Sequence, residues 1–129
     1  MGYALPAAIG AKVACPDRQT VVVCGDGGFQ MAFNELATLV SQGSDIKIVL
    51  LENHVLGLVN EIQKKSYSGP FGVSLDGSPD FGILAQAYGI AFGRVDADQD
   101  IDEAVGRMLA HKGPYILCCG VDADTTTGD

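Results

Sequence analysis

The chain has 129 residues, a size typical of one globular domain, and 47% of them are hydrophobic, which is enough to build a buried core. Its formal net charge is −8, from 16 acidic and 8 basic residues, so contact with a nucleic-acid backbone or an anionic membrane surface is not expected. No stretch approaches the ~20 apolar residues needed to span a bilayer, and the first residues do not resemble a signal peptide. We therefore expect a cytoplasmic domain with no nucleic-acid partner and no membrane association.

Helix-like and strand-like segments alternate along the chain. In chain order, the patterns predict a helix over 5–14, a strand over 20–24, a helix over 31–40, a strand over 46–51, a helix over 56–62, a glycine-rich loop over 64–78, a helix opened by 78–80 and closed by Gly89, a strand over 90–95, a helix over 99–111 and a strand over 115–119. Apolar residues recur at helical spacing in the helices, whereas the first strand is a short continuous β-branched run, as expected for a strand buried on both faces.

This alternation predicts an α/β fold, a doubly wound parallel sheet with helices on both faces and right-handed crossovers. We expect one domain over residues 1–119 and a frayed polar tail over 120–129. The four cysteines match no zinc or redox spacing and are expected to be reduced thiols, mostly buried: Cys15, Cys24, Cys118 and Cys119. Ligands of such sheets bind beyond the carboxyl ends of the strands.

Two polar side chains follow neighbouring predicted strands. Asp26 lies in a Gly25-Asp26-Gly27 turn directly after the run 21–24, and Asn53 follows the run 46–51. An aspartate in such a turn is usually only a turn residue, but the pairing with Asn53 favours a site. Two oxygen ligands beside a glycine-lined turn, with a backbone carbonyl just after Asn53 as a third, suit Mg²⁺ holding a diphosphate. The Walker and dinucleotide-binding patterns are both absent.

Several segments resemble one enzyme superfamily. Residues 1–11, the spacing from Gly-Asp-Gly to Asn53, and the segments 27–38, 53–59 and 78–89 are similar to the C-terminal, thiamine diphosphate-binding domain of thiamine diphosphate-dependent enzymes. Within that superfamily the chain most resembles the large subunit of acetolactate synthase (acetohydroxyacid synthase). The resemblance implies the thiamine diphosphate-binding fold, truncated at the N-terminal side, because a strand and helix expected upstream are missing.

The resemblance also implies a role for each matching position. Mg²⁺ would be bound by Asp26, Asn53 and the carbonyl of Val55. Gly27 and Gly28 would offer backbone N–H groups to the diphosphate, and Met1 would be the apolar side chain that keeps the cofactor bent. The full set of expected cofactor-binding residues is Met1, Gly2, Gly25, Asp26, Gly27, Gly28, Asn53, Val55, Gly57 and Leu58. No residue of this chain matches a catalytic position.

For the parent protein, the resemblance implies a transferase or lyase of branched-chain amino acid biosynthesis. It would decarboxylate one 2-oxo acid, condense the product with a second, and be a homo-oligomer. The activating glutamate would come from a pyrimidine-binding domain of a partner subunit, so the fragment alone is expected to be inactive. FAD is possible in the full-length parent but is not expected to bind here.

Two features depart from the family. Glu52 stands where an asparagine is usual, and its charge could help Mg²⁺ and hinder the diphosphate; the loop 66–77 lacks a tryptophan found near it in many biosynthetic members. Two alternatives therefore stay open. One is a domain of another thiamine diphosphate enzyme (a 2-oxo acid decarboxylase, oxidase or carboligase), and the other is a non-catalytic binding domain.

Overall fold

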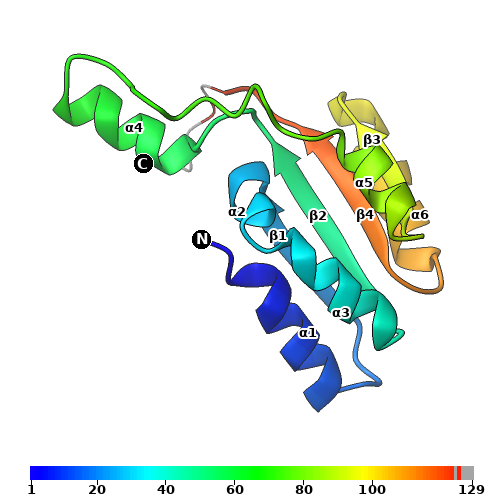
Figure 1. Cartoon of the computed structure of the whole chain (residues 1–129). Coiled ribbons are helices and arrows are strands. Elements are labelled where there is room, and N and C mark those ends of the chain that lie inside the picture. Colours follow the sequence, from blue (N-terminus) through cyan, green and yellow to red (C-terminus); the bar gives the residue numbers. More distant parts are fainter. Residues whose placement is uncertain (124, 126–129) are drawn as a thin grey trace.

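The computed structural model describes residues 1–123 and 125. Its described part holds one sheet of four parallel strands in the order β1-β2-β4-β3 (Figure 1). The strands are β1 (Thr20–Gly25), β2 (Ile46–Glu52), β3 (Ala91–Val95) and β4 (Tyr115–Gly120). β1 and β2 run side by side with Cys24 opposite Leu50, so both strands end at the same edge of the sheet. The predicted parallel α/β fold is confirmed.

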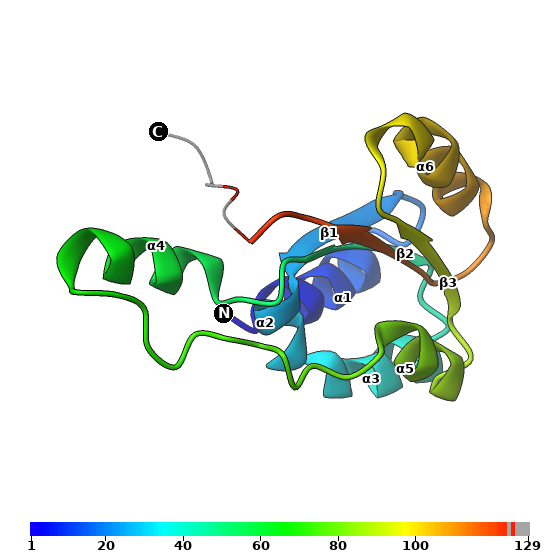
Figure 2. The same cartoon turned by 90° about the horizontal axis from the view of Figure 1, so that it is seen from above.

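Helices cover both faces of the sheet (Figure 2). One face carries α1 (Ala4–Ala14), α2 (Asp26–Gln30), α3 (Leu36–Ser41) and α5 (Phe81–Ala87), and the other carries α6 (Ile101–Ala110). Two 3₁₀ turns, η1 (Phe33–Glu35) and η2 (Asp98–Asp100), precede α3 and α6. The larger apolar cluster lies under the first group of helices and the smaller one under α6. α4 (Gly57–Ser66) extends away from the sheet beyond the carboxyl ends of the strands.

β1 differs from the expected strand that is buried on both faces. Val22 is buried, but Val21 and Val23 are 45% and 59% exposed. Side chains alternate between the two faces of a strand, so Val21 and Val23 share the face opposite Val22. On that face α6 packs against β3 and β4, which leaves the edge strand β1 uncovered.

Two helices have different bounds from those predicted. The segment predicted as one helix over 31–40 contains η1 and α3, and α2 already begins at Asp26, directly after β1. Ala32, between α2 and η1, interrupts the helical backbone with φ −141° and ψ 8°. α4 continues through Ser66, so the first residues predicted as loop are helical. α5 begins as expected after Asp80, whose Oδ1 accepts hydrogen bonds from Gly82 N and Ile83 N at 2.8 and 3.0 Å.

The predicted tail begins inside a strand, because β4 includes Gly120. Val121 N donates to Glu52 O at 2.9 Å and Thr125 N to Asp122 O at 3.0 Å, while residues 124 and 126–129 lie outside the described residues. Within the part of the chain that the structure describes, each helix is too short or too polar to cross a bilayer.

Candidate functional site

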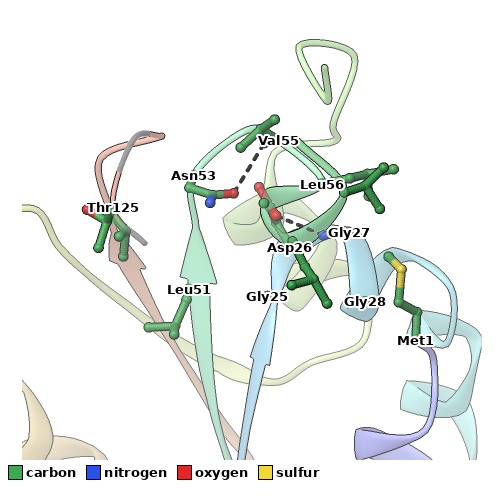
Figure 3. A pocket seen from close by; sticks show the side chains of 14 residues that line it. Met1, Gly25, Asp26, Gly27, Gly28, Leu51, Asn53, Val55, Leu56 and Thr125 are labelled. Atoms are coloured by element: carbon green, nitrogen blue, oxygen red, sulfur yellow. Dashed lines mark hydrogen bonds between the residues drawn. The ribbon is translucent and has the colours of Figure 1, made fainter. Parts of the chain in front are cut away.

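A pocket of about 530 Å³ opens where β1 and β2 end (Figure 3). Nine of the ten predicted cofactor-binding residues line it: Met1, Gly25, Asp26, Gly27, Gly28, Asn53, Val55, Gly57 and Leu58. Gly2 is not among the lining residues. The carboxyl ends of two parallel neighbours meet at one sheet edge, and this brings together residues that are far apart in the sequence.

Asp26 joins the two strand ends. Its side chain is 1% exposed, Oδ1 accepts a hydrogen bond from Gly27 N at 2.8 Å, and Oδ2 accepts one from His54 N at 2.8 Å. Among the described residues no basic side chain pairs with this carboxylate. Each oxygen keeps a further lone pair, so the group can accept a cation as well as these hydrogen bonds.

Asn53 and Val55 line the pocket from the loop after β2. Asn53 Oδ1 accepts a hydrogen bond from Val55 N at 3.2 Å, and in Figure 3 the amide oxygen points to the side where Asp26 lies. Gly57 allows this arrangement, because a Cβ there would stand 3.2 Å from Asn53 Nδ2. Nowhere in residues 1–123 and 125 do three or more His, Cys, Asp or Glu side chains gather as a metal site, so a cation here would depend on one carboxylate plus amide and carbonyl oxygens.

The two glycines of α2 have different surroundings. A Cβ on Gly27 would lie 2.6 Å from Leu56 Cδ2 and 3.1 Å from Leu75 Cδ1, whereas a Cβ on Gly28 would meet no heavy atom within 4 Å. The N–H of Gly27, expected to face a diphosphate, donates to Asp26 Oδ1. Gly27 is therefore needed for close packing, and Gly28 presents open backbone to the pocket.

The remaining wall of the pocket is mostly apolar, and sequence reasoning missed part of it. The additional lining residues are Leu51, Leu56, Val59, Val121 and Thr125. Leu56 and Val59 could have been predicted as pocket residues from the sequence, because they follow Asn53 closely in the chain. Val121 and Thr125 could not, since they reach the pocket through the pairing of β2 with β4, in which Glu52 stands opposite Gly120.

Glu52 and His54 turn their side chains away from this pocket and line a second cavity beside it. Glu52 is 6% exposed, and its Oε2 lies 2.6 Å from Arg94 Nη1 and 3.9 Å from His54 Nε2. Arg94 Nε also donates to both carboxylate oxygens of Asp96 at 3.0 Å. The hydrogen bonds that Arg94 donates, to Asp96 first and to Glu52 second, raise the pKa of the Arg94 guanidinium, which stays charged.

Known proteins share this domain. Residues 1–119 match the family described as thiamine pyrophosphate enzyme, C-terminal TPP binding domain, thiamine pyrophosphate being the same cofactor as thiamine diphosphate. The chain is 47% identical over 118 residues to the acetolactate synthase large subunit of Lactococcus lactis, covering 91% of this chain and 20% of the relative. It is 38% identical over 123 residues to the acetolactate synthase isozyme 2 large subunit of Escherichia coli, covering 95% of this chain and 22% of that protein.

A solved structure agrees with these sequence matches. The thiamine diphosphate-dependent 4-hydroxybenzoylformate decarboxylase of Rhodococcus jostii has a TM-score of 0.88 and 29% identity, covering 98% of this chain and 24% of that one. The chain spans about a fifth of the length of the curated relatives it matches. It belongs to the family of C-terminal thiamine pyrophosphate-binding domains of thiamine pyrophosphate enzymes, and its curated relatives include acetolactate synthase large subunits.

Proposed function

We propose that the pocket binds the diphosphate group of thiamine diphosphate through Mg²⁺, and that the chain is the cofactor-binding domain of an acetolactate synthase-like enzyme. The observation that carries this proposal is the joint position of Asp26, Asn53 and Val55 in one glycine-lined pocket at the ends of two parallel strands. Mg²⁺ prefers oxygen ligands and usually takes few from the protein, leaving the others to phosphate and water.

The chemistry of the donor set fits Mg²⁺. Asp26 is a buried carboxylate supported by two N–H groups but by no basic side chain among the described residues, so a bound cation would compensate its charge. Asn53 would add its amide oxygen and Val55 its carbonyl oxygen. Gly25, Gly27 and Gly28 would leave room for the diphosphate.

The apolar part of the pocket would hold the body of the cofactor. Met1, Leu56 and Leu58 would lie against it, and Gly57 would keep Asn53 in place. Gly2 does not line the pocket, so its contribution would be indirect: its left-handed φ of 75° would set the course of the chain next to Met1, and a Cβ there would stand 3.3 Å from Met31 Cβ.

The bound cofactor would supply an electron sink for decarboxylation, and the residues of this chain would bind and orient it. We assign no catalytic residue to the chain. The glutamate that activates the cofactor would come from the pyrimidine-binding domain of a partner subunit in a cytoplasmic homo-oligomer. In the parent enzyme two 2-oxo acids would be condensed after one is decarboxylated, and FAD, if present, would bind outside this domain.

A second candidate is a 2-oxo acid decarboxylase. It is favoured by the TM-score of 0.88 to a decarboxylase, although the sequence identity of 29% is lower than the 47% to an acetolactate synthase large subunit. Turnover of pyruvate by the full-length parent separates the two, because acetolactate indicates condensation and acetaldehyde indicates simple decarboxylation.

Isothermal titration calorimetry of the 129-residue chain with thiamine diphosphate and Mg²⁺ tests the binding proposal. Asp26→Ala should weaken Mg²⁺-dependent binding by at least about tenfold, because even residues that only support a metal ligand cost that much. The matched control is Asp17→Ala, which removes an exposed carboxylate from the turn before β1, at the other end of that strand from Asp26, and should bind as wild type does. Equal affinity of Asp26→Ala and wild type would refute the metal site, and absence of Mg²⁺-dependent binding would favour a non-catalytic binding domain.

A further inference from the structure

We infer that His54 is a positioning residue whose left-handed backbone holds the two expected Mg²⁺ ligands on either side of it, Asn53 and Val55. The inference rests on the proposed function of the pocket. Its φ is 57°, and it is the only non-glycine residue with positive φ among residues 1–123 and 125. Such a conformation costs free energy in a residue with a Cβ and persists where the surrounding structure requires it.

The contacts of His54 show what imposes this conformation. Its N–H donates to Asp26 Oδ2 at 2.8 Å, and its carbonyl accepts from Leu75 N at 2.8 Å. In the two residues after His54, Leu56 N donates to Val73 O at 2.9 Å, and Val55 forms an isolated antiparallel β-bridge with Ser74. The backbone at His54 is thus held between the buried carboxylate and the segment 73–75.

The turn at His54 also arranges its two neighbours. Asn53 Oδ1 accepts a hydrogen bond from Val55 N at 3.2 Å, so the asparagine side chain closes a turn with His54 at its centre. Asn53 and Val55 both line the pocket, and His54 does not. A residue that cannot adopt positive φ would open this turn and separate the proposed ligands from Asp26.

The imidazole of His54 does not hold the two proposed ligands. It is 55% exposed, lines the second cavity, and comes no closer than 3.9 Å to Glu52 Oε2 through Nε2. The role therefore belongs to the backbone of position 54. Glycine and asparagine, which adopt the left-handed region readily, should replace His54, whereas valine should not.

The experiment compares His54→Gly, His54→Asn and His54→Val in the 129-residue chain. The matched control is Gly43→Val, since Gly43 has nearly the same φ of 59°, stands after α3 away from the pocket, and would place an added Cβ more than 4 Å from any neighbouring heavy atom. Calorimetry gives the affinity for thiamine diphosphate at saturating Mg²⁺ and the Mg²⁺ concentration for half-maximal binding. Amide hydrogen exchange of the ligand-free chain reports the bonds at residues 54, 56 and 75.

We expect His54→Gly and His54→Asn to bind within about threefold of wild type and His54→Val to bind at least about tenfold more weakly, with a matching rise in the Mg²⁺ requirement. Gly43→Val should lower the thermal midpoint of unfolding and leave the affinity unchanged. His54→Val should also lose exchange protection at residues 54, 56 and 75, while His54→Gly keeps it.

Wild-type affinity in His54→Val would overturn the inference, and so would a loss in His54→Gly equal to that in His54→Val, because it would assign the role to the imidazole. If the wild-type chain does not bind thiamine diphosphate with Mg²⁺, the proposed function fails. The exchange data then still decide whether position 54 fixes the loop, since unchanged protection in His54→Val would refute that step by itself.

Discussion

Gly27 and Gly28 are adjacent residues of α2, and a methyl group should have opposite effects on stability at the two positions. At Gly27 the added Cβ would stand 2.6 Å from Leu56 Cδ2, 3.1 Å from Leu75 Cδ1 and 3.5 Å from Met1 Cε. At Gly28 it would meet no heavy atom within 4 Å. The pair Gly27→Ala and Gly28→Ala therefore changes the same chemistry in one helix and differs in the space available.

The expected free energies follow from these surroundings. Overpacking costs about 1–3 kcal/mol, and replacing glycine by alanine inside a helix recovers about 0.5–1 kcal/mol. The atoms closest to Gly27 are ends of flexible side chains that can shift, so we expect Gly27→Ala to lose about 1 kcal/mol of unfolding free energy. Gly28→Ala meets no neighbouring atom, so only the higher helix propensity of alanine applies, and its free energy of unfolding should rise by about 0.5–1 kcal/mol.

Thermal unfolding of the ligand-free chain and calorimetry with thiamine diphosphate and Mg²⁺ measure the two sides of this prediction. In a chain of this size 1 kcal/mol corresponds to a shift of roughly 3–5 °C in Tm. Gly28→Ala should raise Tm and yet weaken binding, because its methyl group would occupy the part of the pocket proposed for the diphosphate. Gly27→Ala should lower Tm and also weaken binding, since Leu56 would be displaced within the pocket wall.

At Gly28 the expected gain in stability and the expected loss of cofactor affinity have opposite signs, so the variant separates a role in binding from a role in folding. A Gly28→Ala variant that gains stability and keeps full affinity would refute the diphosphate position. A Gly27→Ala variant as stable as Gly28→Ala would refute the packing argument, because the contact at 2.6 Å would then impose no cost.

Two further predictions concern Lys47, which is buried, and Cys24, which is partly buried; neither lines the pocket. Lys47, 2% exposed, donates to Asp45 Oδ1, His111 O and Gly113 O at 2.5, 2.7 and 2.6 Å. Asp45 is 47% exposed and can be solvated without its partner, so the main loss in Lys47→Met is the donor for the two carbonyl groups; the urea-derived free energy of unfolding should fall by about 2–3 kcal/mol and cofactor affinity should stay unchanged. A loss under about 1 kcal/mol, on the order of a surface ion pair, would contradict this. Burial raises the pKa of the Cys24 thiol to about 11, which favours its neutral form in the folded chain. The contribution of this thiol to the free energy of unfolding should therefore be fully present below pH ~8.5, the ordinary pKa of an unfolded cysteine, and should be lost as the pH rises from there toward 11. Urea unfolding across this range should show a smaller decline for Cys24→Ala, and equal declines would refute the assignment to this thiol.

The strand pattern and the two polar strand ends could be read from the sequence, because both depend on local order. Continuous β-branched runs such as 20–24 predict parallel strands, and residues directly after such runs must lie at one edge of the sheet. Asp26 and Asn53 line one pocket for this reason. The turn at His54 had no clear signal in the sequence, because only a few per cent of non-glycine residues have positive φ, even though histidine is several-fold enriched among them.

Features that depend on which strands become neighbours could not be predicted. β1 lies at the edge of the order β1-β2-β4-β3, and this position exposes Val21 and Val23. The pairing of β2 with β4 brings Val121 to the pocket, although no motif connects it with Asp26. The buried amine of Lys47 likewise depends on carbonyl groups that lie more than 60 residues away along the chain.

Glu52 shows how the arrangement of strands changes an electrostatic expectation drawn from sequence. A carboxylate adjacent to Asn53 was expected to act on Mg²⁺ and on the diphosphate, but consecutive side chains of a strand point to opposite faces. Leu51 accordingly lines the pocket, while Glu52 turns to Arg94 of β3 at 2.6 Å and has its charge offset there. Among the described residues that line the pocket, Asp26 is therefore the only carboxylate, and the attraction for a cation proposed here depends on that one group.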